Sequence, residues 1–422
     1  MGPSSEVVIT GMGVVSPIGI GIEEFWNSLL QGRSGVRILR SFESVGIASP
    51  LGSEVANFVP AQYVRPRKSL KLMSRDIQLA FAAADMACTQ AGLKEGQVDP
   101  ERFGVEFGAD LIAADVDEMV SPYQGCMQDG QFDFSRWGHQ GLSNFYPLWM
   151  LKYLPNMPAC HIGIVHDARG PNNTHTMGEV SSLSALIEGV RTIQRGQADA
   201  IITGGVGCRN QPTIWARRKS YELSQRYDDP AAACRPFDAD RDGMVFGEGS
   251  ASFLLESRDH AAARGATIYA RILGAANSFE PLSRGALPQG QAIRHTIQAV
   301  LQEAALQPAD IGHVKADGLG TIHDDRIEAR AIRDLLGDVP VTAPKSYFGN
   351  LSAGSGAVEL AVSVLSLNRG IIPPVLNYHR PDPECPINVI RDQPLSGARP
   401  VALVLSNSPT GRSMGLVVAG EG

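Results

Sequence analysis

Apolar runs alternate with amphipathic stretches along the whole chain. The apolar runs predict buried strands at residues 7–15, 103–108, 198–207, 250–256, 269–273, 312–316 and 401–406. Stretches with apolar side chains at three- and four-residue spacing, or rich in alanine, predict helices at residues 25–30, 70–93, 180–194, 291–305, 328–336 and 357–367. Short strands that alternate with helices are typical of parallel-rich sheets covered on both faces. The pattern alone therefore predicts an α/β fold.

One stretch, residues 168–182, combines a tight turn with the start of a helix. It has the sequence A-R-G-P-N-N-T-H-T-M-G-E-V-S-S, in which Gly170 and Pro171 favour a turn and helical apolar spacing begins at Val180. Glu179 is therefore expected at, or one residue before, the first turn of the helix. Unpaired N–H groups and the helix dipole favour an anion there. Many acyl-transfer enzymes present their nucleophile on such a turn, and here the presented residue is a carboxylate.

This stretch resembles the active-site elbow of the β-ketoacyl-ACP synthases. In that family the pattern runs close to G-P-N-x-S-x-S-T-A-C-A-T-S, and its Cys carries the acyl group; in a gapless alignment Glu179 takes the position of that Cys. Residues 7–35 resemble the opening of the family, and residues 154–163 resemble its I-P-N-M-A-A-G-H-I-S segment. Residues 234–249, C-R-P-F-D-A-D-R-D-G-M-V-F-G-E-G, resemble its R-P-F-D-x-x-R-D-G-F-V-x-G-E-G motif almost residue for residue. In this motif we expect a buried ion network of Asp238, Arg241, Asp242 and Glu248.

The resemblance covers nearly the whole chain and implies a specific form of the α/β fold. That form is the thiolase-like fold, five-layered αβαβα with two pseudo-symmetric halves, and it is normally an obligate dimer. We expect the N-terminal half, with the altered nucleophile elbow, at residues 1–257 and the C-terminal half at residues 258–422.

Two further family motifs carry substitutions. The motif near A-H-G-T-S-T-x-x-x-D corresponds to residues 316–325, where Asp317 takes the position of the His. The motif K-S-x-x-G-H corresponds to residues 345–350, where Lys345 is kept and Asn350 takes the position of the His. In the family these His residues bind the malonyl thioester carbonyl and promote decarboxylation. The resemblance thus makes Glu179, Asp317, Asn350 and Lys345 the candidate site residues.

These substitutions remove the chemistry of condensation. A thiolate forms a reactive thioester, whereas a carboxylate that attacked a thioester would give a mixed anhydride, which is uphill and readily hydrolysed. Asp317 would repel a developing enolate, while Asn350 could still donate one hydrogen bond. Loss of one such donor costs about two to three orders of magnitude in rate, and here the nucleophile is missing as well. Condensation by the family mechanism is therefore predicted to be absent.

Three interpretations remain open. The first is a condensation-inactive partner or pseudoenzyme, similar to the chain-length factors that pair with an active ketosynthase and lack its Cys. The second is a re-tasked acyl-thioester enzyme, a hydrolase, cyclase or other acyltransferase, in which Glu179 and Asp317 form an acid/base pair beside Lys345. The third, a malonyl decarboxylase, is weaker because both His residues are absent. Glu179 and Lys345 could also form a buried ion pair that fills a disused pocket.

Composition and charge limit the remaining possibilities. The chain has 422 residues and a net charge of −7, with no block of basic residues, which argues against nucleic-acid binding. No apolar stretch is long enough to span a membrane and no signal peptide is recognisable, so a cytoplasmic protein is expected. The six cysteines are scattered, which favours reduced, mostly buried thiols.

The expected partners follow from the family, and no cofactor or metal is expected. The partners are an acyl carrier protein or acyl thioester, and either a second copy in a homodimer or an active ketosynthase in a heterodimer. His175 and His323 lie near the motifs, but isolated histidines are usually structural or surface residues. Residues 172–174, Asn-Asn-Thr, are interpreted as a turn.

Overall fold

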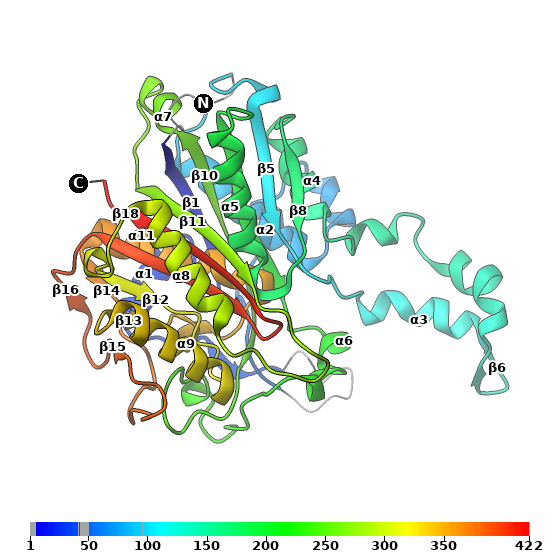
Figure 1. Ribbon diagram of the computed structural model, residues 1–422. Coiled ribbons are helices and arrows are strands. Elements are labelled where there is room, and N and C mark those ends of the chain that lie inside the picture. Colours follow the sequence, from blue (N-terminus) through cyan, green and yellow to red (C-terminus); the bar gives the residue numbers. More distant parts are fainter. Residues whose placement is uncertain (1–5, 41, 43–49, 95, 422) are drawn as a thin grey trace.

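The computed structural model describes residues 6–40, 42, 50–94 and 96–421. Its principal strands form one continuous sheet in which two similar halves meet (Figure 1). The first half has the strand order β8 (Asn172–His175), β5 (Phe103–Gly108), β9 (Ala200–Cys208), β10 (Phe246–Ser257) and β1 (Val7–Ser16). The second half continues with β11 (Ala270–Phe279), β18 (Arg412–Ala419), β17 (Val401–Ser408), β12 (His313–Lys315), β13 (Pro340–Thr342) and β15 (Asn388–Val389).

The two halves share one pattern of strand directions. In the first half, β1 pairs antiparallel with β10 and β10 pairs antiparallel with β9, whereas β9, β5 and β8 run parallel. In the second half, β11 and β18, and then β18 and β17, are antiparallel, whereas β17, β12 and β13 run parallel. The halves meet where β1 pairs with β11. The repetition confirms the predicted pseudo-symmetric architecture.

Helices form the other three layers of the αβαβα arrangement. The outer layer on the first half contains α2 (Arg75–Gln90) and α4 (Met157–Val165), and the outer layer on the second half contains α8 (Gln291–Ala304) and α9 (Ile322–Leu336). Between the two halves lie α5 (Ser181–Gln194) and α11 (Ser355–Arg369), which contact strands of both (Figure 1). Because α11 is enclosed on all sides, every residue from Ser355 to Ser366 is buried, and the helix is apolar around most of its circumference.

Small residues allow the outer helix α2 to lie close to strand β1. A Cβ atom added at Gly11 would come within 2.2 Å of the Ala87 carbonyl oxygen, and one added at Gly13 within 2.1 Å of the Ala83 carbonyl oxygen. The alanine-rich sequence of α2 matches these glycines, because close contact between two backbones requires small side chains on both. The predicted apolar stripe on α2 is therefore core.

Several predicted elements differ from the observed ones. The helix expected over residues 70–93 is divided into a 3-10 segment (Arg67–Leu72) and α2. The irregular region expected at residues 109–141 contains α3 (Val116–Gly125) and the strand pair β6 (Met127–Gln128) and β7 (Gln131–Phe132). Residues 172–174 were predicted to be a turn, but they belong to strand β8, because their backbone pairs with β5.

The segment that contains α3, β6 and β7 extends away from the rest of the molecule (Figure 1). We call residues 116–150 the arm. A chain of contacting aromatic rings runs through it, from Tyr123 through Phe132, Trp137 and Phe145 to Trp149. The arm and its flanks also expose large apolar side chains, including Phe134 with 74% of its surface accessible. An apolar surface of this extent is typical of a contact with another protein.

Neither a disulfide bond nor a membrane-spanning helix is present in the described residues. All six cysteines are free, and five of them are buried, as predicted. None of the helices in the described ranges has both the length and the apolar character needed to cross a membrane.

Candidate functional site

Glu179 lies in a 3-10 turn (Gly178–Val180) directly before α5, as the sequence predicted. Gly178 has φ +67°, a left-handed conformation that glycine adopts without strain, and this turn directs Glu179 inward. The side chain is buried, with 8% of its surface accessible. Its carboxylate accepts a hydrogen bond from Arg209 Nη2 at 2.5 Å and one from Ser408 Oγ at 3.5 Å.

Arg209, the partner of Glu179, follows immediately after strand β9. Its guanidinium lies over the rings of Tyr221 and Phe246, 5.1 Å from each centroid, and 5% of the residue is accessible. Its Nε and Nη1 have no hydrogen-bond partner among the described residues. The ion pair of Glu179 is therefore made with Arg209, and the alternative pair with Lys345 is not formed.

Lys345, which the sequence motif aligns with the family lysine, starts α10 (Lys345–Phe348) and is fully enclosed. Its Nζ donates to the backbone oxygen and to Oδ1 of Asp317, each at 2.9 Å, and lies 2.7 Å from Glu359 Oε1. Glu359 also pairs with Lys315, so cations and carboxylates alternate along a buried row. Burial alone lowers the pKa of Lys345, but the two carboxylates outweigh it and hold the pKa above its usual range.

Asp317 and Lys345 meet because of the parallel strands β12, β13 and β17. Asp317 follows the end of β12, and Lys345 follows the end of β13. The carboxyl ends of parallel strands share one edge of a sheet, which brings these segments together. Ser408, at the end of β17, lies at the same edge and reaches Glu179. The bond between Ser408 and Glu179 therefore links the second half of the molecule to the first.

Glu328 of α9 is hydrogen-bonded to the backbone of the segment that contains Asp317. Its carboxyl group accepts hydrogen bonds from the backbone nitrogens of Asp317 and Gly318, at 2.8 and 2.9 Å, and from Asn407 Nδ2 at 2.8 Å. Burial, with a smaller contribution from the nearby Asp317 carboxylate, raises the pKa of Glu328 to about 8. Burial therefore favours the protonated form of Glu328.

The raised pKa of Glu328 predicts that stability falls as the pH rises from about 4.5 to about 8. The unfolded chain releases this proton near the ordinary value of 4.5, whereas the folded chain holds it to about pH 8. Folded chains bind more protons between these values, so the free energy of unfolding falls as the pH rises through this window. Asp76 and Asp325, whose buried carboxyls have pKa values of about 7, contribute with the same sign.

Urea denaturation at about pH 5.5 and pH 8 measures this dependence. Glu328→Gln is expected to reduce the difference in stability between the two pH values, because glutamine does not titrate. Glu384→Gln, at an exposed glutamate, serves as the control and should keep the full difference. An unchanged difference in Glu328→Gln contradicts the assignment.

Asn350, which the sequence motif aligns with the second family His, is hydrogen-bonded to nearby groups of the chain. Its Oδ1 accepts from Ser352 N at 2.9 Å and from Ser355 Oγ at 3.3 Å, and its Nδ2 lies 3.5 Å from Met244 Sδ. The residue is buried, with 1% of its surface accessible. The amide therefore stabilises the turn before α11.

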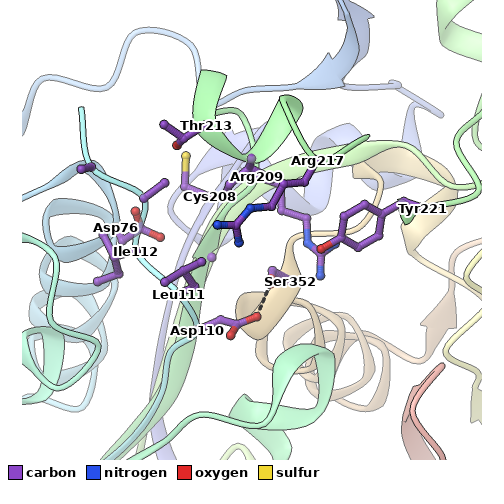
Figure 2. A pocket seen from close by; sticks show the side chains of 14 residues that line it. Asp76, Asp110, Leu111, Ile112, Cys208, Arg209, Thr213, Arg217, Tyr221 and Ser352 are labelled. Carbon is purple, nitrogen blue, oxygen red and sulfur yellow. Dashed lines mark hydrogen bonds between the residues drawn. The ribbon is translucent and has the colours of Figure 1, made fainter. Parts of the chain in front are cut away.

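Two cavities lie on either side of Glu179. The first, of about 250 Å³, is lined by residues that include Arg209 and Ser352 (Figure 2). The second, of about 20 Å³, is lined by residues that include Asp317, Glu328 and Ser408. The Glu179 carboxylate accepts hydrogen bonds from Arg209 in the wall of the first cavity and from Ser408 in the wall of the second.

The four candidate residues thus form separate groups. Asp317 and Lys345 are in direct contact. Within the described part of the chain, no hydrogen bond or ion pair joins Glu179 or Asn350 to these two. Glu179, Asp317 and Lys345 form ion pairs, and Asn350 accepts a hydrogen bond from the backbone of Ser352.

The ion network expected in residues 234–249 is not one network. Asp238 pairs with Arg235, Asp242 with Arg226, and Glu248 with Arg75. Arg241 is buried against Asp325 and Asp382. The charged side chains of this motif face different elements. Each of the four residues in the expected network therefore forms its ion pair with a residue outside that network.

The two histidines near the motifs are hydrogen-bonded, as expected of structural residues. His175 lies between Ser184 Oγ, at 2.9 Å, and Glu106 Oε2, at 3.2 Å. His323 Nε2 contacts the Pro288 carbonyl oxygen at 2.7 Å. Among the described residues, no group of three or more His, Cys, Asp or Glu is arranged to hold a metal ion.

Sequence reasoning missed Arg209, Glu328 and Glu359. A signal existed for two of them. Arg209 is a charge directly after a buried strand, at the sheet edge where functional side chains gather. Glu359 is the one carboxylate inside the otherwise apolar α11, and a buried charge needs a partner. The sequence around each carboxylate does not indicate which cation pairs with it.

Family models cover both halves of the chain. Residues 4–261 match the model described as Beta-ketoacyl synthase, N-terminal domain, and residues 269–379 match Beta-ketoacyl synthase, C-terminal domain. The chain belongs to the β-ketoacyl synthase family. The chain is 33% identical over 408 residues to the 3-oxoacyl-[acyl-carrier-protein] synthase 2 of Synechocystis sp. (strain ATCC 27184 / PCC 6803 / Kazusa). The aligned region covers 95% of this chain and 94% of that protein.

Solved structures of β-ketoacyl synthase relatives superpose over almost the whole chain. One is a type II PKS acyl-carrier protein in complex with its ketosynthase bound to the hexaketide, with a TM-score of 0.83, 28% identity, and coverage of 99% of this chain and 100% of that one. Another is the ishigamide ketosynthase/chain length factor, with a TM-score of 0.86, 26% identity, and coverage of 99% and 100%. The protein is therefore ketosynthase-like, has the thiolase-like fold, and belongs to fatty-acid or polyketide biosynthesis.

Proposed function

We propose that this protein is a condensation-inactive, chain-length-factor-like partner of an active ketosynthase. The observation that carries the proposal is the ion pair of Glu179 with Arg209 at the position of the acyl-carrying Cys. A carboxylate cannot form a useful acyl intermediate with a thioester, and this one is also held by a guanidinium in a buried setting. The nucleophile position is therefore occupied by a structural contact.

The positions of the two imidazoles support the same conclusion. Asp317 is paired with Lys345, so it offers neither a neutral N–H donor nor a free cation to a developing enolate. Asn350 uses its amide oxygen on Ser352 N and Ser355 Oγ, and its amide nitrogen faces Met244. Together these contacts leave no donor pair aimed at a thioester carbonyl.

The arm supports a role in a dimer. Its exposed apolar side chains, such as Phe134 and Met150, are more extensive than an isolated protein usually presents to water. One structural relative is described as a ketosynthase/chain length factor, and another as an acyl-carrier protein in complex with its ketosynthase. We propose a ketosynthase and an acyl carrier protein as partners of this chain, with a homodimer as the alternative assembly.

A second candidate function is the re-tasked acyl-thioester enzyme. The observation in its favour is the second cavity, where Asp317 lies beside Glu328, and burial shifts the pKa of Glu328 toward the protonated form that acid catalysis requires. The cavity volume of about 20 Å³ is near that needed for a single water molecule, so an acyl substrate would require the site to open. We therefore favour the partner role.

Two further expectations remain predictions. The division of the chain at residues 257 and 258 agrees with the repeated strand order, because β10 ends at Ser257 and β11 opens the second repeat. A cytoplasmic location is expected from the sequence.

Acyl transfer and decarboxylation assays test the proposed function. The purified chain is incubated with radiolabelled acyl carrier protein and, separately, with malonyl carrier protein, alone and after coexpression with a ketosynthase that has the Cys-His-His set. We expect no acyl-enzyme and no decarboxylation from the chain alone, and copurification with the ketosynthase. Robust activity of the chain alone would defeat the proposal. Turnover that Glu179→Gln abolishes while the fold remains stable would favour the second candidate.

A further inference from the structure

A third cavity lies beside the turn that joins strand β1 to helix α1 (Ile22–Leu30). Its volume of about 240 Å³ is enough for a small organic molecule. Its walls come from residues 16–20 of the turn, from α1, from residues 33–34 after α1, and from residues 56–57. None of these residues lines the first or the second cavity, so this site is separate from the one around Glu179.

Two charges of opposite sign line the third cavity without pairing. Glu24 on α1 and Arg33 after α1 both border it, and neither forms an ion pair with the other or with any other residue in the described ranges. By contrast, Glu23, the neighbour of Glu24, pairs with Arg369. A cation and an anion that lie more than 4.0 Å apart in one cavity leave a gap that a dipolar ligand can bridge.

Backbone contacts hold the two charged residues at the wall of the third cavity. Glu24 Oε2 accepts a hydrogen bond from Ile20 N at 2.9 Å, which leaves the other carboxylate oxygen for a ligand. The Arg33 backbone nitrogen donates to the Ser28 carbonyl oxygen at 3.0 Å. The carboxylate, and the backbone that carries the guanidinium, are therefore positioned before a ligand arrives, which lowers the cost of binding.

The apolar wall of the third cavity is closely packed. Pro17 and Ile18 form it, and a Cβ atom added at Gly35 would lie 2.8 Å from Pro17 Cβ and 3.2 Å from Ile18 Cγ2. The turn therefore lies directly against the segment that follows α1, and neither can shift toward the other. The cavity thus offers two opposite charges beside a preformed apolar surface.

A ligand with a single charge suits this cavity poorly. A simple anion on Arg33 faces the Glu24 carboxylate, and a simple cation on Glu24 faces the Arg33 guanidinium. A zwitterion satisfies both charges, and an α-amino acid carries its ammonium and its carboxylate on one carbon atom.

We propose that the third cavity binds a small aliphatic α-amino acid, with its carboxylate on Arg33, its ammonium on Glu24 and its side chain against Pro17 and Ile18. This site does not depend on the partner role, because it shares no residue with the site around Glu179.

Calorimetric titration of the full-length protein at pH 7 with valine, valinamide and 3-methylbutanoate tests the site. The three probes have the same branched side chain, but valinamide lacks the carboxylate and 3-methylbutanoate lacks the ammonium. We expect saturable 1:1 binding of valine, and binding of each analogue that is roughly tenfold weaker, because each lacks one charge-assisted hydrogen bond. Glycine should bind more weakly than valine, because it leaves the apolar wall uncovered.

Two variants with opposite selectivity locate the charges. Arg33→Gln should weaken the binding of valine and of 3-methylbutanoate by roughly tenfold and make that of valinamide no weaker. Glu24→Gln should weaken the binding of valine and of valinamide by the same factor and make that of 3-methylbutanoate no weaker, since glutamine can still accept the bond from Ile20 N. Glu23→Gln, at the adjacent paired glutamate, is the control and should bind all three probes as the unmodified protein does.

Three results would each overturn the proposal. The first is the absence of saturable valine binding, and the second is valine binding no tighter than that of both analogues. The third is a pair of variants that weaken all three probes equally.

Discussion

Replacing Lys345 with methionine is expected to destabilise the protein by about 3–5 kcal/mol, because the change leaves a buried carboxylate without its cation. Lys345 lies between Asp317 and Glu359, and all three side chains are almost inaccessible to water. Glu359 keeps Lys315 as a partner in the variant, but Asp317 has no second cation among the described residues. The free energy of unfolding from urea titration measures the loss.

Two comparisons make the Lys345 result specific. Lys345→Met combined with Asp317→Asn should recover part of the lost stability, since the unpaired charge is then removed. Arg380→Met breaks an exposed pair with Asp240 and should cost about 1 kcal/mol or less. A Lys345 variant that is no less stable than the Arg380 variant would show that the buried row contributes nothing.

Arg209→Met is expected to have the second large effect, also about 3–5 kcal/mol, since Glu179 would then be buried with only Ser408 as a side-chain partner. The variant also loses the contacts of the guanidinium with the rings of Tyr221 and Phe246. Methionine is long enough to cover the same rings, so the charge is the main quantity changed. Thermal and urea unfolding of the purified variant measure the effect.

The double variant Arg209→Met with Glu179→Met should regain most of this stability, because a buried ion pair can be replaced by apolar residues at little cost. The control is Arg330→Met, which breaks an exposed pair with Glu384. If the double variant is as unstable as the sum of its single changes, the two side chains do not interact, and the structural role of Glu179 is refuted.

The two acidic substitutions have one feature in common. Each carboxylate that the motifs align with a catalytic position of the family is matched to a cation, Glu179 to Arg209 and Asp317 to Lys345. Buried charges are costly without such partners, so a chain that acquired these acids needed both cations in place. The observed pairing agrees with a site maintained for the stability of the fold.

The sequence by itself was sufficient for the local features of this protein. Apolar periodicity located β1, β5, β9, α5 and α11, because strands and helices impose side-chain periods that short stretches reveal. Turn chemistry placed Glu179 at the start of α5, and the family motifs predicted which catalytic residues are substituted. The sequence was a poorer guide where strand pairing overrides the local preference of the residues. Strand β8 has residues typical of a turn, but its backbone pairs with β5.

Tertiary structure alone decided the partners of these residues. Glu179 meets Arg209 because β8 and β9 flank β5 in parallel and end at one edge, and Lys345 meets Asp317 because β12 and β13 do the same. Arg209 lines the larger of the two cavities, and Asp317 lines the smaller. A charge in a sequence shows that a counter-charge is needed, but only the order of strands in the sheet determines which distant residue supplies it.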